Sequence, residues 1–388
     1  MATMNNSKLN QYEKHHSFSS FHSNHDVEDI SMQSLRASRI LSEFCLNNST
    51  SKYTSIYKVI IDDLNAVEAG IRFKVTPFIA DEMAAIDDLD LPRYLYHRYR
   101  YDIHPQKNIL DDYPPYLQIE PTSVCNFRCV FCYQTDDSFN KKQNGFMGNM
   151  QLDMYKNIVD QIEGNVEFLS LASRGEPLLC KEFPAMLEYS IDKFLNLKVN
   201  TNASLLTEKL CHDLLNGAVQ TLVFSADAAE EPLYSQMRVN GKLDKVLSNI
   251  KMFQTIKEKY YSNSRIITRV SGVMFDRRQS MESMINLWSN LVDQVSFVKY
   301  NPWENIYETD PNEINTPCSD LWRRMFIWFD GKVNPCDSDY KSELCVGNIL
   351  DGQGVSQIWR SGEYANLRIK HAEGKRQSKE PCRRCSVV

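Results

Sequence analysis

Residues 116–133 read YLQIEPTSVCNFRCVFCY, a short apolar run that predicts a β-strand, followed by a loop with three closely spaced cysteines. Cys125, Cys129 and Cys132 form a C-x3-C-x2-C pattern. With 11 cysteines in 388 residues, chance would produce this pattern in about one such sequence in a hundred. Thiols at this spacing therefore indicate metal binding or redox chemistry.

The chain after residue 115 alternates short apolar runs with longer amphipathic stretches. Six runs predict strands: YLQIE (116–120), VEFLSLA (166–172), LKVN (197–200), VQTLVFSA (219–226), IITRVSGVM (266–274) and QVSFVKY (294–300). Strands separated by helical stretches indicate βαβ units and a parallel sheet. Because eight units close a TIM barrel, six predict a partial (β/α)6 TIM-type barrel. A doubly wound open sheet is the alternative.

The unusual motifs all follow predicted strands. SRGEP (173–177) follows the second strand, TNAS (201–204) the third and SAD (225–227) the fourth, as the cysteine loop follows the first. In parallel α/β folds, ligands bind at the carboxyl ends of the strands. We therefore expect these motifs to meet at one mouth of the barrel.

Composition limits the classes of function. The net charge is −6 and the pI is about 5.8, which argues against a nucleic-acid-binding face. No apolar stretch is long enough to span a membrane, and the N-terminus lacks signal-peptide features. We expect a cytoplasmic protein with no membrane partner, in which clustered cysteines bind metal rather than form disulfides.

Three thiolates in one loop could hold zinc or an iron–sulfur cluster. Structural zinc sites usually pair two C-x2-C units at close range, and the other C-x2-C here, Cys382 to Cys385, is far along the chain. A loop with three cysteines fits better with a [4Fe–4S] cluster that leaves one iron open for a non-protein ligand.

This loop, placed after the first strand of a partial barrel, resembles the hallmark of the radical S-adenosylmethionine (SAM) superfamily. The resemblance implies that SAM chelates the open iron and that one electron, from a donor such as flavodoxin or ferredoxin, cleaves it to a 5′-deoxyadenosyl radical. That radical abstracts hydrogen from a small-molecule or peptide substrate. The cofactor carries the chemistry, and the protein supplies orientation.

The resemblance extends to the SAM-binding residues. Phe131 occupies the aromatic position that packs on adenine, with plain core packing as the alternative. Gly175 and Glu176 resemble the end of the family's Gly-Gly-Glu motif, which lies beside the SAM amino group; Arg174 stands in place of the first glycine. Glycine allows close backbone approach, and a carboxylate complements an ammonium group.

The stretch FSADAAEEPLYSQMRVNGKLDKVLSNI (224–250) resembles the SPASM branch of the superfamily. By that resemblance, Ser225 would contact the SAM ribose or carboxylate, and Arg238 would pair with the carboxylate. Weaker candidates for the SAM pocket are residues 200–202 and Val273, and residues 299–301 are candidates for the substrate pocket.

The C-terminal cysteines Cys318, Cys336, Cys382 and Cys385 could complete a second [4Fe–4S] ligand set, with zinc as the alternative. Their layout resembles the shortened SPASM or twitch subdomain, which carries one auxiliary cluster. Asp-Gly in FDGKVNPCD predicts a β-hairpin. Cys345 remains as a possible hydrogen donor, the role that a thiol near the auxiliary cluster has in epimerases of this branch.

We therefore expect four regions. Residues 1–28, rich in Ser, Asn and His, predict a disordered tail. Residues 29–113 form an N-terminal extension of unknown role, in which IYKVII (56–61) is strand-like. Residues 114–310 are the expected barrel, and residues 311–388 the auxiliary-cluster subdomain.

The leading functional prediction is a radical SAM oxidoreductase that oxidises a small polar substrate, such as a sugar alcohol or aminocyclitol, with electron transfer to the auxiliary cluster. A peptide-modifying SPASM maturase and a radical epimerase are alternatives; in a maturase, residues 29–113 could recognise a peptide. A non-catalytic metal-binding protein is a further alternative, against which the GEP motif, Ser225 and Arg238 argue, because a carrier needs no SAM pocket.

Overall fold

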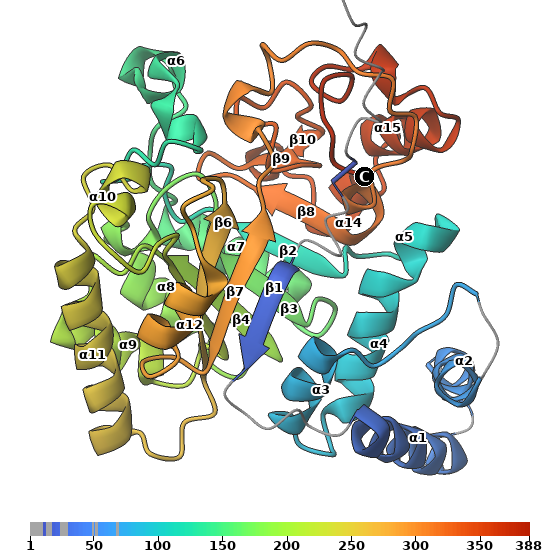
Figure 1. Ribbon diagram of the computed structural model, residues 1–388. Coiled ribbons are helices and arrows are strands. Elements are labelled where there is room, and N and C mark those ends of the chain that lie inside the picture. The colour runs from blue at the N-terminus through green and yellow to red at the C-terminus, as the bar shows by residue number, and fades with distance from the viewer. Residues whose placement is uncertain (1–10, 13–17, 24–29, 49, 51–52, 67–69) are drawn as a thin grey trace, which may run out of the picture.

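Six parallel strands form the centre of the structure (Figure 1), a computed structural model that describes residues 11–12, 18–23, 30–48, 50, 53–66 and 70–388. In chain order they are β2 (Tyr116–Ile119), β3 (Phe168–Leu171), β4 (Asn196–Thr201), β5 (Thr221–Ser225), β6 (Ile267–Met274) and β7 (Gln294–Lys299). Each pairs in parallel with the next. In a doubly wound sheet the strand order reverses at a switch point, whereas here the six strands follow chain order without a reversal. The predicted partial barrel is confirmed, and the doubly wound alternative is wrong.

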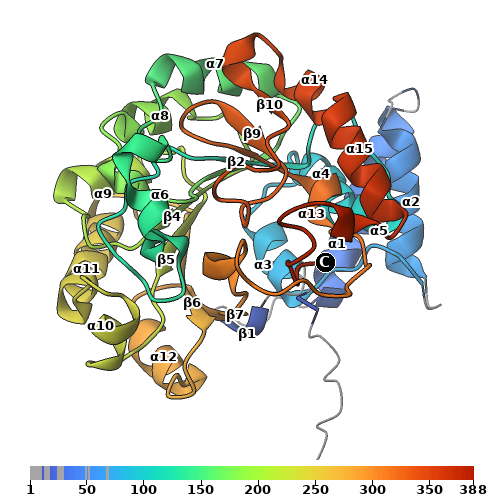
Figure 2. The same cartoon turned by 90° about the horizontal axis from the view of Figure 1, so that it is seen from above.

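Helices cover the outer face of these strands, and Figure 2 shows them as an arc around the sheet. They are α7 (Leu152–Ile162), α8 (Phe183–Tyr189), α9 (Glu208–Leu215), α11 (Leu243–Tyr260) and α12 (Met281–Trp288). In α11, the buried residues Val246, Ile250 and Phe253 lie on one stripe and share a core with the strand residues Leu222 and Val270. The main apolar core therefore lies between the sheet and the outer helices.

The C-terminal segment continues the sheet beyond β2. β8 (Arg324–Ile327) pairs in parallel with β2, and β9 (Lys332–Asn334) and β10 (Gly347–Asn348) follow antiparallel. The Asp330–Gly331 turn joins β8 to β9, with Gly331 at a φ of +82°, so the predicted hairpin is confirmed. Helices complete the segment: α13 (Asp320–Arg323), α14 (Val355–Trp359) and α15 (Gly362–Ala372).

The N-terminal helices form a second, smaller core at the amino-terminal end of the barrel strands. They are α1 (Ile30–Asn47), α2 (Thr54–Asn65), α3 (Pro77–Ala84), α4 (Leu91–Asp102) and α5 (His104–Lys107). The ring of His97 stacks on Phe168 with the centroids 3.7 Å apart, which anchors α4 to β3. The strand-like reading of IYKVII is wrong because Tyr57 and Ile60, one helical turn apart, are its buried residues in α2.

Strand β1 (Phe18–Ser23) corrects part of the predicted disordered tail. It pairs antiparallel with β7 and forms one edge of the sheet, while β10 forms the other, so the barrel stays open. Tyr12 pairs with Val387. A short, serine-rich strand is stabilised by pairing with a neighbouring strand. Amino-acid composition carries no information about such pairing, so it predicted disorder here. Most other residues of 1–28 lie outside the described part of the chain.

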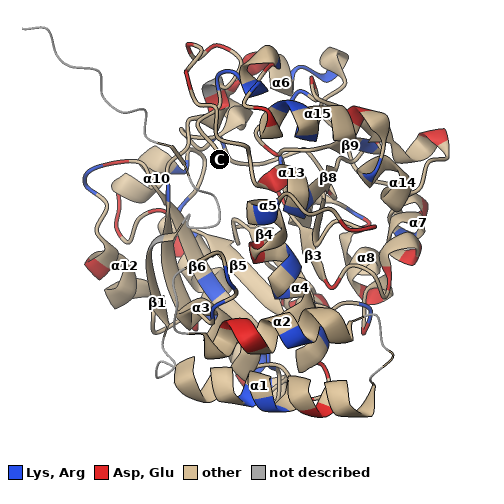
Figure 3. Cartoon of the chain, turned by 90° about the vertical axis from the view of Figure 1, so that its right-hand side faces the viewer, with Lys and Arg blue, Asp and Glu red and all other residues tan. Residues whose placement is uncertain are grey.

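Charges of both signs are spread over the surface helices, as Figure 3 shows along α1, α2 and the C-terminal segment. In the described part of the chain, no helix combines the length and the apolarity needed to cross a bilayer.

Candidate active site

The cysteine loop follows the carboxyl end of β2 and is held by backbone hydrogen bonds, both within the loop and to the last residue of α10 (Leu233–Met237). The amide of Val130 donates to the Met237 carbonyl at 3.1 Å, and the amide of Cys132 donates to the Cys129 carbonyl at 3.0 Å. Cys129 is buried, and Cys125 and Cys132 are half-buried. The three thiols are therefore presented from one tight, fixed loop at the mouth of the barrel.

Hydrogen-bond donors around these cysteines would stabilise their thiolate form when a metal centre is bound. The Phe127 amide donates to Cys125 Sγ at 3.4 Å, and Arg238 Nη1 donates to Cys129 Sγ at 3.7 Å. Burial raises the pKa of Cys125 to about 12 and raises the pKa of Cys129 and of Cys132. Thiols in such a site ionise when a metal centre supplies positive charge, so metal binding would release protons.

The three thiols of the loop are near neighbours, because the charges of Cys125 and Cys129 each act on the pKa of Cys132. Cysteine thiolates are the protein ligands of [4Fe–4S] clusters. The loop therefore fits the predicted cluster.

Glu176 lies next to this loop in a buried position. Its carboxylate accepts a hydrogen bond from the Thr201 hydroxyl at 2.6 Å and from the Asn202 amide at 2.7 Å, which ties the GEP segment to the end of β4. Burial raises the pKa of Glu176 to about 7. A bound ammonium group would restore the charged form, so this carboxylate fits the predicted role beside the SAM amino group.

Gly175 is required by close packing of the GEP segment on the cysteine loop. A Cβ at this position would lie 2.5 Å from the Val124 carbonyl oxygen and closer still to that of Thr122. The Glu176 amide donates to the same Val124 carbonyl at 2.8 Å. Any side chain at residue 175 would therefore push Glu176 away from the loop.

We expect Gly175→Ala to lower the free energy of unfolding by about 1–3 kcal/mol, because the added methyl group overlaps backbone that cannot move away freely. Chemical unfolding followed by circular dichroism measures this change. Gly362→Ala is the matched control, since a Cβ there meets no atom within 4 Å. Equal stability of the two variants would contradict the close packing.

Arg238 is buried and forms an ion pair with Asp227, while its guanidinium also reaches Cys129. Its Cζ lies 5.6 Å from the ring centroid of Phe131. The predicted partners Arg238 and Phe131 are thus brought together beside the loop. Ser225 is half-buried at the last position of β5. The contacts of these residues with SAM remain predictions.

Asp227 is a site residue that the sequence did not single out. Its second carboxylate oxygen accepts a hydrogen bond from the Val273 amide at 2.6 Å, so it joins Arg238 to the end of β6. The only sequence signal was its place in the SAD tripeptide after a strand. Asp227 follows β5 and Arg238 follows α10 (Leu233–Met237), so their contact depends on the fold and not on a local repeat.

A group of polar side chains links the cysteine loop to the end of β4. Asn202 Nδ2 donates to Asn126 Oδ1 at 2.9 Å, and Asn126 Nδ2 donates to the Ser204 hydroxyl at 2.9 Å. The sequence named Asn202 as a weaker candidate for the SAM pocket, whereas Asn126 was missed. This network holds the loop over the mouth of the barrel.

Arg174, which departs from the glycine of the family motif, has a structural role. It forms a doubly hydrogen-bonded, buried ion pair with Glu120, with the Nη2–Oε1 distance at 2.6 Å. Its Nη1 donates to the Tyr340 carbonyl at 2.7 Å, and the Phe329 amide donates to Glu120 at 3.2 Å. The pair therefore connects the barrel mouth to the C-terminal segment.

The four C-terminal cysteines lie in a second group. The charges of Cys318 and Cys385 act on the pKa of Cys382, and Cys336 and Cys318 both act on Tyr364. Burial raises the pKa of Cys318 to about 11 and also raises that of Cys382. These four thiols could complete the ligand set of one cluster.

Backbone hydrogen bonds and one arginine brace this second group. The Ser338 amide donates to Cys336 Sγ at 3.3 Å. Buried Arg376 donates to the carbonyls of Cys385 and Val387 at 3.0 and 2.8 Å. Cys345, by contrast, is exposed and donates its thiol proton to the Gly347 carbonyl at 3.2 Å, and its role as a hydrogen donor remains a prediction.

A cavity of about 40 Å³ lies at the mouth between the barrel and the C-terminal segment. Lys299, Asn301 and Val273, all weaker candidates from the sequence, line it together with Trp303. Ser338, which binds Cys336 Sγ, also lines it, so this cavity adjoins the second cysteine group.

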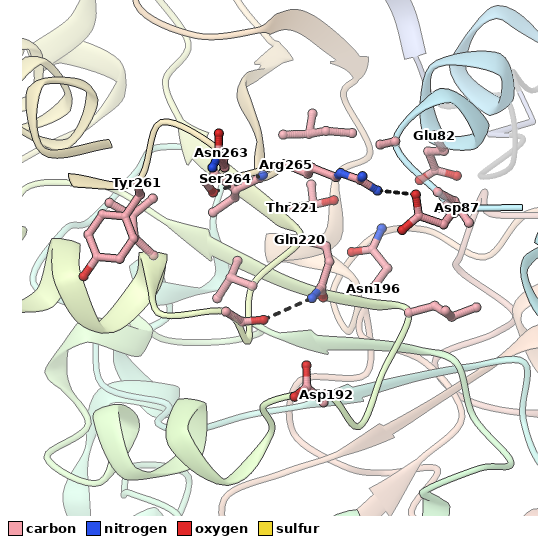
Figure 4. Close-up of a pocket in the computed structure, with 18 of the residues that line it drawn as sticks. Glu82, Asp87, Asp192, Asn196, Gln220, Thr221, Tyr261, Asn263, Ser264 and Arg265 are labelled. Atoms are coloured by element: carbon pink, nitrogen blue, oxygen red, sulfur yellow. Dashed lines mark hydrogen bonds and ion pairs between the residues drawn. The ribbon is translucent and has the colours of Figure 1, made fainter. Parts of the chain in front are cut away.

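A cavity of about 690 Å³ lies at the opposite end of the strands (Figure 4). Asn196, Thr221 and Ile267, the first residues of β4, β5 and β6, line it together with Glu82 and Tyr94 of the N-terminal helices. Catalytic residues of such barrels lie at the carboxyl ends of the strands. This cavity is therefore not part of the candidate active site.

Two family models match the chain. Residues 119–267 match the Radical SAM superfamily, and residues 318–386 match SPASM, an iron–sulfur cluster-binding domain. The first range contains the cysteine loop, Glu176 and Arg238, and the second contains the four C-terminal cysteines. A radical SAM domain implies a [4Fe–4S] cluster with SAM, and a SPASM domain implies auxiliary iron–sulfur clusters.

The curated relatives match this chain over only part of their length and part of its own. The S-adenosylmethionine-dependent nucleotide dehydratase of Selenomonas ruminantium is 29% identical over 161 residues, which cover 41% of this chain and 56% of the relative. The GTP 3′,8-cyclase of Clostridium botulinum is 24% identical over 190 residues, which cover 48% and 56%. The chain thus spans little more than half the length of these relatives.

Solved structures share the fold. BtrN in complex with AdoMet and 2-DOIA is 20% identical, with a TM-score of 0.50 over 70% of this chain and 93% of BtrN. Streptococcus suis SuiB bound to S-adenosylmethionine is 14% identical, with a TM-score of 0.52 over 90% of this chain and 87% of SuiB. The cysteine loop, the partial barrel and both family matches agree: residues 119–267 are a radical SAM domain, and residues 318–386 are a C-terminal SPASM iron–sulfur domain.

Proposed function

We propose that this protein is a radical SAM oxidoreductase that acts on a small polar substrate of the sugar-alcohol or aminocyclitol type. The observation that carries the proposal is the presence of two separate thiol groups in one chain. The first has three cysteines beside Glu176 and Arg238 at the barrel mouth, and the second has four. Three ligands leave one iron open, whereas four leave none.

In this proposal, Cys125, Cys129 and Cys132 hold the cluster that binds SAM. When bound, the cluster and SAM supply a 5′-deoxyadenosyl radical, with the electron delivered by a donor such as flavodoxin or ferredoxin. Glu176 holds the SAM amino group, and Phe131 packs on the adenine. Arg238 and Ser225 orient the carboxylate and ribose.

The second group, Cys318, Cys336, Cys382 and Cys385, holds the auxiliary cluster. Oxidising an alcohol to a carbonyl removes one hydrogen atom from carbon, one electron, and the hydroxyl proton. A cluster with four protein thiolates supplies an acceptor for that electron. The hydrogen-bond donors that surround these sulfurs favour the more negative, reduced state.

Peptide modification is the second candidate function, and one observation favours it. The fold likeness to SuiB covers 90% of this chain, against 70% for BtrN. A SuiB structure also exists with its precursor peptide bound. In this case the N-terminal helices would recognise a peptide. Stimulation of SAM cleavage by a peptide and not by any polyol would favour this candidate.

Anaerobic reconstitution tests the proposal. The protein is loaded with iron and sulfide, iron per chain is counted, and 5′-deoxyadenosine is measured after SAM and dithionite are added. About eight irons per chain together with 5′-deoxyadenosine are expected from two [4Fe–4S] clusters. Bound zinc, or iron without SAM cleavage, would overturn the proposal.

We expect the double variant Cys382→Ala/Cys385→Ala to hold about four irons per chain, because one of two four-iron clusters is lost. SAM cleavage without substrate should persist, since the first thiol group is intact. Iron analysis and the 5′-deoxyadenosine assay measure both. Cys345→Ala is the control and should keep about eight irons. Full iron content in the double variant would contradict the four-cysteine assignment.

A further inference from the structure

The cavity at the amino-terminal ends of the barrel strands has the size and the walls of a small-molecule site (Figure 4). Its volume is about 690 Å³, and apolar side chains such as Ile86, Leu215 and Val219 line it. Pockets of about 300–1,000 Å³ that combine apolar walls with a few polar groups are typical ligand sites. Strand β4 begins in this cavity and ends at Thr201, which donates to Glu176. A ligand bound here would therefore be separate from SAM and its substrate.

Carboxylates outnumber cations among the charged residues that line this cavity, which are Glu82, Asp87, Asp192 and Arg265. Arg265 Nη1 lies 2.7 Å from Asp87 Oδ1, so these two charges neutralise each other. Glu82 and Asp192 form no ion pair with any Lys or Arg of the described residues. Two carboxylates without a cationic partner give the cavity a negative charge, which attracts a positively charged ligand.

Glu82 is the more deeply buried of these two carboxylates, with an exposed fraction of 8%. One of its oxygens, Oε2, accepts a hydrogen bond from the Tyr94 hydroxyl at 2.7 Å. The charges of Arg98 and Arg269 also act on Glu82, but neither arginine forms an ion pair with it in the described part of the chain. Burial raises the pKa of Glu82. A cation bound beside this carboxylate would stabilise its charged form.

Two neutral polar groups of the cavity wall also lack partners. Thr221 is 4% exposed, and its hydroxyl has no hydrogen-bond partner among the described residues. Asn196 Oδ1, on the neighbouring strand, is buried without a partner there. In Figure 4 a dashed line joins Arg265 to Asp87, whereas none reaches Thr221 or Asn196. Buried polar groups are rarely left unpaired, so these two oxygens point to a ligand that donates hydrogen bonds.

We propose that this cavity binds a small organic cation, either a primary amine or a guanidinium compound. The cation pairs with Glu82, and its remaining N–H donors bind Thr221 and Asn196. A metal ion fits the cavity less well, because it would leave most of the volume empty and would not contact the apolar walls. The proposal goes beyond the proposed function, since it involves neither iron–sulfur cluster and no SAM.

Calorimetric titration of the reconstituted holoenzyme, under anaerobic conditions and at constant ionic strength, tests the proposal with two cations. Putrescine carries two amines, and agmatine carries one amine and one guanidinium group. Saturable binding of at least one of them is expected, and the tighter binder shows which group the site prefers. The neutral probe 1,4-butanediol has hydroxyls in place of the amines of putrescine. It should bind at least about tenfold more weakly than the preferred cation, because it lacks the charge that pairs with Glu82.

Glu82→Gln should weaken binding of the cation by at least about tenfold, because it removes the buried charge while it keeps the size of the side chain and an acceptor for Tyr94. Asp192→Asn should weaken binding by about two- to fivefold, since Asp192 is exposed. Residue 192 has a φ of +60°, which Asn adopts readily. Glu373→Gln removes an exposed carboxylate beside α15 and is the control, which should leave binding unchanged.

Three results would overturn the cation site: no saturable binding of either cation, equal binding of 1,4-butanediol, or unchanged binding in both Glu82→Gln and Asp192→Asn. If Glu82→Gln does not fold, unchanged binding in Asp192→Asn overturns it alone. The titration needs no SAM cleavage. Its outcome is therefore independent of the 5′-deoxyadenosine assay that tests the proposed function.

Discussion

Replacing Cys125, Cys129 and Cys132 together by Ala is expected to lower iron from about eight to about four per chain and to abolish 5′-deoxyadenosine formation. The reason is that these three thiols are the only sulfur ligands in the loop beside Glu176 and Arg238. Without them no open iron is available at the barrel mouth. Iron analysis, the optical spectrum and chromatography of the SAM products measure the effect.

Cys45→Ala is the control for this prediction, since Cys45 lies in α1 of the N-terminal helices. It should keep both the iron and the SAM cleavage. The assignment of the loop fails if the triple variant still cleaves SAM, or if it keeps all of its iron. If the triple variant unfolds, it should lose all of its iron together with its secondary structure. Circular dichroism detects that unfolding and so distinguishes it from the expected result.

Arg174→Met is expected to lower the free energy of unfolding by about 3–5 kcal/mol, because it leaves the Glu120 carboxylate buried without its partner. Glu120 is 0% exposed and Arg174 3% exposed, so water cannot replace the lost contacts. The guanidinium also lies 4.5 Å from the Trp328 ring and donates to the Tyr340 carbonyl. The variant should therefore loosen the C-terminal segment from the barrel.

Anaerobic chemical unfolding measures this loss, with two comparisons. The double variant Glu120→Gln/Arg174→Met should lose less stability than Arg174→Met alone, since no uncompensated charge remains. Lys209→Met breaks an exposed ion pair with Asp213 and should change stability by less than about 1 kcal/mol. Equal losses for Arg174→Met and Lys209→Met would show that the buried pair has no special role.

The strands and the mouth of the barrel were predictable because their signals are local. Apolar runs of four to nine residues mark these strands whatever their partners are, and C-x3-C-x2-C is complete within eight residues. The Asp-Gly turn between β8 and β9 is equally local. Strand β1 was not predictable, because Phe18–Ser23 is a strand only through its pairing with β7.

In the candidate site, too, the residues in local motifs were predictable and those defined by long-range contacts were not. Glu176 and Arg238 could be named from motifs close to strand ends. Thr201, the partner of Glu176, was named only as a weaker SAM-pocket candidate. Asp227, the partner of Arg238, and Asn126, which bonds Ser204, were not identified, since each contact joins residues separated by 11 or more positions. Hydrogen bonds between distant segments leave no periodic trace in a sequence.

By itself, the sequence determined the order of the six strands, the loop of three thiols and the set of four C-terminal cysteines, all through local spacing and polarity. Only the tertiary structure decided that Arg174 joins the barrel to the C-terminal segment and that Lys198 and Arg324 both lie beside the Tyr116 ring. The physical reason is that strand register brings together residues from separate strands.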